Sequence, residues 1–290
     1  MRTRSPFQKI FFLPPIRPLI AILGVTLLAV LLTSKVRSDL DFRKNDVFLT
    51  PYDNLIGEKK NLHLRLAIIS DLHVDDSESS YAQLRALVED VLKSTPQVIL
   101  LLGDYTQSPR SIRNLAQHRI AVSEILTGLN SVPTISVLGN YENWSEPSRW
   151  SQAFTDAGIN LLENEVVKLS IGDDEVCFRG LGDAFTMQFA YVDFPLDCSD
   201  LPKITFTHDP AGAFDPRIKG LVFAGHTHCG QVRIPYFGSL WVPSEAPKKA
   251  TCGLYKDDQR LLWVSSGVGY SLLPIRFGAK AQWDLVRISY

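Results

Sequence analysis

Short apolar runs alternate with amphipathic stretches through the first part of the chain. The apolar runs have the length and composition of buried strands and lie at 64–70, 97–103 and 133–139. The amphipathic stretches that follow them lie near 81–93, 112–129 and 146–157. Strand and helix patterns in this order predict β-α-β units, and therefore a parallel sheet.

Beyond residue 160 the pattern changes, and the apolar runs are strand-like with few helical stretches between them. These runs lie at 166–171, 176–182, 203–207, 221–225, 231–235, 261–267 and 283–289. A strand-rich half beside a parallel α/β half favours two sheets packed against each other. Sheets of this kind carry their sites at the strand ends.

The N-terminal segment differs in kind from the rest of the chain. Residues 18–34 carry no charge between Arg17 and Lys35, and this length is near the lower limit of a membrane-spanning helix. A cleaved signal peptide is the competing interpretation, but the run ends in TSKVRSD and lacks the small residues of a cleavage site. We therefore expect residues 1–34 to be an uncleaved, single-pass anchor in the cell (inner) membrane.

The flanks of this segment leave the membrane side open. Positive residues lie on both sides of the apolar run, so the positive-inside rule does not decide the orientation. Residues 35–60 are charged and contain Pro51 and Gly57, which predicts a tether. The remaining residues 61–290 form the expected folded domain.

Charge and cysteine content exclude some classes of protein. The net charge of -1 over 290 residues gives no electrostatic footprint for nucleic acid. The four cysteines have no CxxC spacing, so the sequence predicts neither a zinc knuckle nor a disulfide framework, and the compartment stays open. They are Cys177, Cys198, Cys229 and Cys252.

Polar residues recur at the ends of five predicted strands. In chain order they are Asp71 with His73, Asp104, Asn140, His208, and His226 with His228. A single Asp or Asn after a strand is commonly a turn residue, and an isolated His-x-His is commonly a pair of loop histidines. A series that contains four of the six histidines predicts a metal site instead, since side chains at i and i+2 of an extended stretch point to the same side.

The motifs D-x-H, GD, GN, H and GH-x-H, in this order, resemble those of the calcineurin-like metallophosphoesterases over roughly residues 60–290. The stretches GHTHCGQVRIPYFGSL and VSSGVGYSLLPIRFG further resemble the bacterial membrane-associated YaeI and YkuE type of phosphodiesterase. The resemblance implies an α/β fold, a four-layer α-β-β-α sandwich, which here would follow an N-terminal transmembrane helix.

Carried over residue by residue, the resemblance also implies a two-metal centre. One ion would be held by Asp71, His73 and His228, and the other by Asn140, His208 and His226. Asp104 would bridge the two ions.

The ligand chemistry agrees with a centre of this kind. Carboxylate, amide and imidazole ligands suit Mn, Fe, Co or Zn and do not single out one metal. We interpret Cys229 as structural rather than as a thiolate ligand.

Two divalent metal ions at this centre would hydrolyse a phosphodiester or pyrophosphate bond through a bridging hydroxide. The anchor favours a lipid precursor such as UDP-2,3-diacylglucosamine, which relatives cleave in lipid A biosynthesis.

Tyr141 departs from the family pattern. Many relatives carry a histidine after the metal-binding asparagine, and that histidine helps to protonate the leaving group. We expect Asp104, Asn140 and Tyr141 to be the catalytic residues, with a water molecule or Glu142 as other possible proton donors. The competing hypothesis is a metal-binding membrane protein with a structural or partner-binding role and little turnover.

Overall fold

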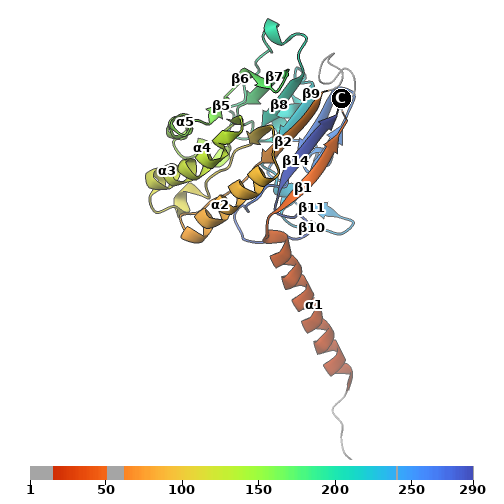
Figure 1. Cartoon of the computed structure of the whole chain (residues 1–290). Helices are drawn as coiled ribbons and strands as arrows, with labels where there is room; N and C mark the ends of the chain where they lie inside the picture. The colour runs from red at the N-terminus through yellow and green to blue at the C-terminus, as the bar shows by residue number, and fades with distance from the viewer. Residues whose placement is uncertain (1–15, 51–61, 240, 290) are drawn as a thin grey trace, which may run out of the picture.

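The computed structural model describes residues 16–50, 62–239 and 241–289. Two six-stranded sheets form the centre of the domain (Figure 1). The first sheet has the order β1 (Arg43–Leu49), β14 (Gln282–Ser289), β2 (His63–Ile69), β3 (Val98–Leu101), β4 (Thr134–Ser136) and β5 (Asn160–Leu161). The strands from β2 to β5 are parallel, as the β-α-β pattern predicted.

The second sheet is formed by the later, strand-rich part of the chain. Its order is β12 (Gly253–Lys256), β13 (Arg260–Val264), β9 (Gly220–Ala224), β8 (Lys203–Thr207), β7 (Asp174–Leu181) and β6 (Glu165–Ile171). The four inner strands are parallel and the two edge strands are antiparallel to their neighbours. A short hairpin, β10 (Arg233–Ile234) and β11 (Gly238–Ser239), stands outside both sheets.

The helices of the domain cover the outer face of the first sheet. They are α2 (Glu78–Lys93), α3 (Leu115–Leu126), α4 (Asn140–Asn143) and α5 (Pro147–Asp156). One apolar core lies between the two sheets, where Ile68, Leu100 and Phe206 are fully buried, and a second lies between the first sheet and its helices. The long helices therefore lie close to the amphipathic stretches that predicted them.

The fourth, helical layer of the expected sandwich is absent from the described residues. The outer face of the second sheet is covered by short 3-10 turns and by apolar side chains such as Phe189, Val192 and Phe214. The connections on this face carry prolines, including Pro195 and Pro210, which limit helix formation there. The fold is an α/β sandwich with mixed sheets and helices on one side.

Residues 43–49 correct the extent of the predicted tether. This stretch forms β1, an edge strand that pairs in parallel with β14 along its whole length. Val47 and Leu49 point into the core and are buried. The charged residues of RKNDVFL obscured the strand pattern, because an edge strand needs only one apolar face.

Helix α1 (Ile16–Leu40) precedes β1 and projects away from the domain (Figure 1). Its described apolar side chains are largely exposed, with Val25, Leu27 and Leu31 at 67%, 59% and 58%. Within the part of the chain that the structure describes, no helix meets the length and hydropathy needed to cross a membrane.

Two disulfides join the four cysteines, a framework that the sequence did not predict. Cys177 on β7 bonds to Cys198, and Cys229 bonds to Cys252. The partners are separated by 21 and 23 residues in sequence and meet only because the second sheet brings their segments together. Spacing alone could not reveal this pairing.

Candidate metal centre

The seven predicted ligand residues converge at one edge of the sandwich. Each group follows the carboxyl end of a parallel strand: Asp71 and His73 follow β2, Asp104 follows β3, Asn140 follows β4, His208 follows β8, and His226 and His228 follow β9. All seven side chains are buried, with at most 5% of their surface exposed. The packing of the two sheets therefore joins into one site residues that are up to 157 positions apart (228 − 71).

The ligand atoms form two groups of three. Asp71, His73 and His228 make one group, and Asp104, His208 and His226 make the other, with the atoms of each group within 4.8 Å of one another. Oδ1 of Asn140 lies 3.2 Å from Nε2 of His208, so the amide oxygen faces the second group.

Asp104 belongs to the second group but also lies close to the first. Its Oδ2 atom lies 3.5 Å from Nε2 of His73 in one group and 3.5 Å from Nε2 of His208 in the other. Its Oδ1 atom accepts a hydrogen bond from the backbone N–H of Tyr141 at 2.9 Å. One carboxylate oxygen is thus held by the backbone, and the other is left between the two groups of ligands.

The strand ends turn sharply to aim these side chains. Asp71, Asp104 and His226 have φ angles of 55°, 55° and 66°, in the left-handed region that non-glycine residues rarely adopt. The neighbouring glycines allow close approach between segments. A Cβ atom on Gly225 would lie 1.7 Å from Oγ of Ser70, and one on Gly139 would lie 2.3 Å from Oδ1 of Asp104. Strain of this kind clusters at functional sites.

Burial and mutual charge set the protonation of the centre. Burial lowers the pKa of His73 and of His226 to about 4, and burial, with the nearby His73 and Arg276, holds the pKa of His228 well below its usual value. Burial alone would raise the pKa of Asp104, but the surrounding histidines, His208 first, lower it to about 2. Burial alone would lower the pKa of His208, but the adjacent Asp104 raises it well above its usual value. At neutral pH the centre without metal therefore holds an ionised Asp104 and a protonated His208 beside the neutral imidazoles of the other three histidines.

The hydrogen bonds of two histidines orient their free nitrogens into the centre. Nδ1 of His208 donates to the carbonyl oxygen of Leu102 at 2.6 Å, and Nε2 of His226 donates to the carbonyl oxygen of Pro243. The remaining atoms, Nε2 of His208 and Nδ1 of His226, lie 3.1 Å apart. Lone pairs that converge in this way, together with carboxylate and amide oxygens, fit two divalent metal ions.

Glu142 is a structural residue that the sequence did not reveal. Its buried carboxylate accepts hydrogen bonds from four backbone N–H groups, those of Asp104, Tyr105, Thr106 and Gly139, at 2.8–3.1 Å. These bonds hold the turn that carries Asp104. Both oxygens of Glu142 accept bonds from backbone donors, which argues against Glu142 as the alternative proton donor.

Arg276 is a second residue that sequence reasoning missed. It is fully buried, and its guanidinium lies 2.9 Å from Nδ1 of His228. It also donates to the carbonyl oxygens of Ser266 and Gly269, so it holds the loop beside the centre. The sequence did contain one signal for this residue, since Arg276 lies inside the apolar run LLPIRFG. A charged side chain in a buried run needs polar partners, so its position could have indicated a buried, hydrogen-bonded arginine.

Tyr141 lies against the first group of ligands. Its ring makes an edge contact with His73, with centroids 4.9 Å apart, and its hydroxyl lies 3.1 Å from Oγ of Ser271. Burial raises the pKa of Tyr141 above its usual value. The phenol is therefore neutral at pH 7 and stands beside the metal centre.

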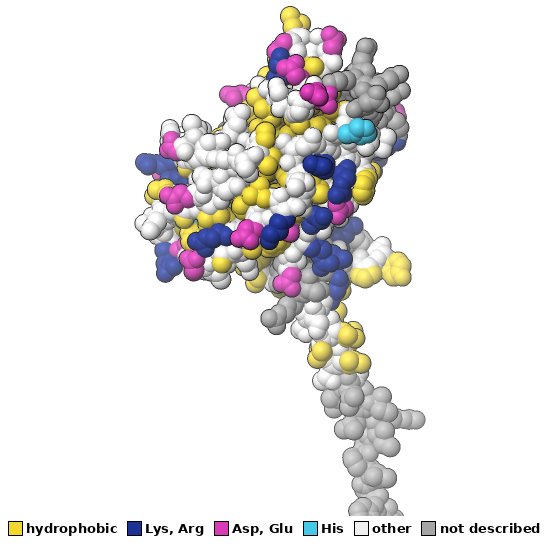
Figure 2. Space-filling model, viewed as in Figure 1, with side chains coloured by type: hydrophobic (Ala, Val, Ile, Leu, Met, Phe, Trp, Pro, Cys, Tyr) yellow, Lys and Arg dark blue, Asp and Glu magenta, His cyan; other side chains and the backbone are white. Residues whose placement is uncertain are grey.

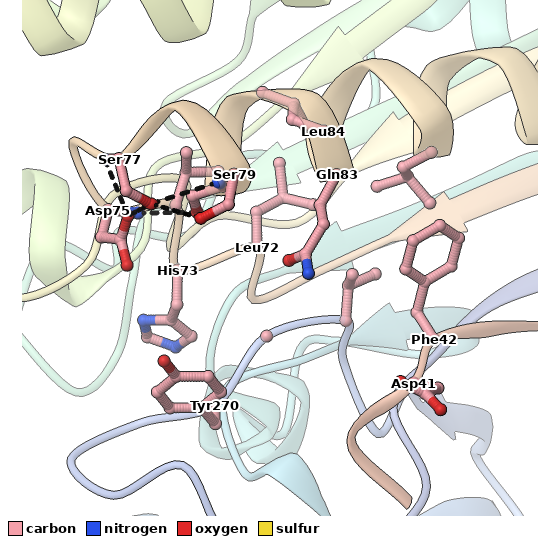
Figure 3. A pocket seen from close by; sticks show the side chains of 15 residues that line it. Asp41, Phe42, Leu72, His73, Asp75, Ser77, Ser79, Gln83, Leu84 and Tyr270 are labelled. Carbon is pink, nitrogen blue, oxygen red and sulfur yellow. Dashed lines mark hydrogen bonds between the residues drawn. The ribbon is translucent and has the colours of Figure 1, made fainter. Parts of the chain in front are cut away.

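A cavity of about 440 Å³ opens next to His73. Figure 3 shows His73 and Tyr270 at one end of it and Phe42 with Asp41 at the other. Leu72 and other apolar residues line part of the wall, and serine side chains from the start of α2 line another part. A group attached to a phosphate at the centre could extend into this space.

The chain is similar to several known proteins. Residues 64–230 match the family model for calcineurin-like phosphoesterases. The uncharacterized metallophosphoesterase YkuE of Bacillus subtilis (strain 168) is 26% identical over 224 residues, which cover 75% of this chain and 76% of that protein. Phosphodiesterase YaeI of Escherichia coli (strain K12) is 26% identical over 234 residues, covering 77% of this chain and 82% of that protein.

A solved structure supports the fold at a greater distance. NAD nucleotidase (NadN) of Haemophilus influenzae aligns with a TM-score of 0.50 at 14% sequence identity, covering 73% of this chain and 46% of that one. The chain spans about half the length of that structure. The likeness concerns the sandwich that carries the centre.

Proposed function

The chain belongs to the calcineurin-like phosphoesterase family, and on that premise we propose that it hydrolyses phosphodiester or pyrophosphate bonds at a two-metal centre. It is a metal-dependent phosphohydrolase, as the match over residues 64–230 and the likeness to YaeI indicate. The observation that carries the proposal is the position of Asp104, whose Oδ2 atom lies 3.5 Å from a histidine of each ligand group.

The chemistry of the proposed reaction follows from the residues around the centre. Two bound divalent ions supply an activated water molecule and polarise the phosphoryl oxygens. Asn140 contributes a neutral oxygen, which leaves the centre with more positive charge than an aspartate would and so favours an anionic phosphate. We propose that Tyr141, whose ring lies against His73, donates the proton to the leaving group.

We further propose that α1 anchors the enzyme in a membrane. Residues 18–34 carry no charge, and the described apolar side chains of α1 are not covered by the domain. The two disulfides support a domain that faces an oxidising compartment, because disulfides persist there and are rare in the cytosol. The catalytic domain would then lie outside the cytoplasm.

A lipid-linked phosphoester is the substrate class we propose for such an enzyme. The cavity beside His73 ends at Asp41 and Phe42, the two residues that follow α1. A substrate whose phosphate reaches the centre while its remaining part fills this cavity would be held close to the anchor. A head group such as that of UDP-2,3-diacylglucosamine is one member of this class.

Activity of the purified chain with Mn²⁺ on bis(p-nitrophenyl) phosphate tests the proposal. We expect Asp104→Ala to lose more activity than His73→Ala, because loss of the bridging carboxylate affects both ions. The two variants should also differ in bound metal when measured by elemental analysis. Wild-type turnover no higher than that of Asp104→Ala would favour a structural or partner-binding role for the centre.

A further inference from the structure

Large apolar side chains are exposed around the mouth of the metal centre. Tyr236, Phe237, Trp241, Leu272 and Leu273, here called the apolar rim, are exposed by 105%, 84%, 66%, 80% and 61%. Isolated exposed apolar residues are ordinary, but a contiguous group of this size commonly marks an interaction surface. These five side chains are therefore candidates for an interaction surface.

The rim belongs to two segments that are tied together next to the centre. The first is the β10–β11 hairpin with Trp241, and the second is the loop at 271–275. Oε1 of Gln231 accepts a hydrogen bond from the backbone N–H of Ser271, and Val232 forms β-bridges to Phe277 and Gly278. These contacts hold the two segments side by side.

A hollow connects the rim to a metal-ligand residue. Its volume is about 170 Å³, and its lining includes His228, Trp241, Leu272 and Leu273. The hollow thus places the side chains of the rim next to a residue of the metal centre.

Strand register places the rim and α1 at the same edge of the domain. Asn45 of β1, Asp284 of β14 and Ile68 of β2 are in register, and β2 runs opposite to β1. Phe42, three residues before Asn45, therefore lies at the level of Asp71, three residues after Ile68. Figure 1 likewise shows α1 leaving the domain beside the β10–β11 hairpin.

The surface near this edge also carries positive charge. Figure 2 shows Lys and Arg side chains over β1 and β14, near the point where α1 joins the domain. Arg43 and Lys44 at the start of β1 belong to this edge. Positive side chains near a membrane surface are attracted to anionic lipid head groups.

We propose that the apolar rim rests in the interface of the lipid bilayer and that the metal centre draws its substrate from that bilayer. The inference rests on the proposed membrane attachment and phosphoester hydrolysis, and it deepens them by assigning a membrane-contact surface. Tyr and Trp side chains are enriched at this depth because they combine an apolar ring with a polar group. An anchor at the same edge keeps the rim within reach of the bilayer.

The test uses the full-length chain reconstituted in vesicles of phosphatidylcholine and phosphatidylglycerol. Brominated acyl chains quench tryptophans that enter the bilayer, and Trp241→Phe identifies the signal of the rim. We expect Tyr236→Ser with Phe237→Ser to weaken this quenching. A matched control, Phe48→Ser with Leu196→Ser, removes apolar side chains that are 72% and 92% exposed at the opposite edge and should leave the quenching unchanged.

Activity is measured on two substrates that share one leaving group. They are bis(p-nitrophenyl) phosphate in solution and a phospholipid with a p-nitrophenyl phosphate head group in the vesicles. The rim variant should hydrolyse the phospholipid at least about ten-fold more slowly, because burial of each aromatic side chain contributes at least that factor to membrane contact. Its kcat/KM for the soluble substrate should equal that of the wild type.

The outcomes separate this inference from the proposed function. Equal quenching and equal phospholipid hydrolysis in the rim variant and in the wild type would overturn the membrane-contact surface. A rim that mediates association between copies of the chain, with a change of oligomeric state and no quenching, would overturn it as well. If the wild type hydrolyses neither substrate, the proposed function itself fails.

Discussion

Substitution of Glu142 by Gln probes how the fold holds the carboxylate of Asp104, the proposed bridge between the two ions. The two oxygens of Glu142 accept four backbone N–H groups, whereas a glutamine has one oxygen and would turn its NH₂ group toward two of these donors. Asp104 follows Gly103 on the turn that Glu142 holds, so we expect both the stability of the domain and the geometry of the metal centre to suffer.

The magnitude follows from the bonds that are lost. A buried donor that loses its partner costs about 1–3 kcal/mol, so two such donors cost about 2–6 kcal/mol. Burial and the nearby Asp104 raise the pKa of Glu142 to about 8, so the carboxyl is largely uncharged at neutral pH and its replacement by an uncharged amide changes little charge there. We therefore expect a net loss of about 3 kcal/mol, which is a large part of a typical stability of about 5–15 kcal/mol.

Glu163 provides a matched control. It is half-buried, and burial raises its pKa to about 7, but among the described residues it accepts one backbone N–H, from Leu138 at 2.8 Å. The single oxygen of a glutamine can replace that bond, so Glu163→Gln should cost less than about 1 kcal/mol.

Urea denaturation with Mn²⁺ present measures both variants against the wild type. Thermal unfolding should show a drop of about 6–12 °C for Glu142→Gln, at about 2–4 °C per kcal/mol in a domain of this size. Bound metal should fall in the same variant. Equal midpoints for Glu142→Gln and Glu163→Gln would refute the role assigned to the four hydrogen bonds.

Three further predictions concern the strand ends and the centre. Gly225→Ala should abolish bound metal as measured by elemental analysis, because its Cβ would lie 1.7 Å from Oγ of Ser70; normal metal content would contradict the packing. Cys229→Ser with Cys252→Ser should lower the free energy of unfolding by about 3 kcal/mol, since the disulfide closes a loop of 23 residues, and an unchanged urea midpoint would contradict this. Tyr141→His should flatten the dependence of kcat/KM on leaving-group pKa, because an imidazolium near neutral pH donates a proton more readily than a phenol does; a flat dependence in both enzymes would exclude Tyr141 as the proton donor.

Local patterns in the sequence were sufficient for most of the buried strands and singled out the candidate ligand residues. A buried parallel strand has a short apolar run, and the residue after it must serve the turn or the site, so Asp71, Asp104 and His226 stood out by position alone. The resemblance added which of them belong to the same ion. The structure brings these residues together in two clusters, Asp71 with His73 and His228, and Asp104 with His208 and His226, and Asn140 lies beside the second cluster.

The tertiary structure decided the features that depend on contacts between distant segments. Strand β1 lacks a clear pattern by itself and is defined by its pairing with β14 at the other end of the chain. The disulfide partners, the four donors around Glu142 and the buried position of Arg276 likewise result from chain segments that only the sheets bring together. The periodic pattern of a segment shows which face of its helix or strand is buried. A contact partner in another segment leaves no such pattern in the sequence, so only the packed fold could reveal these contacts.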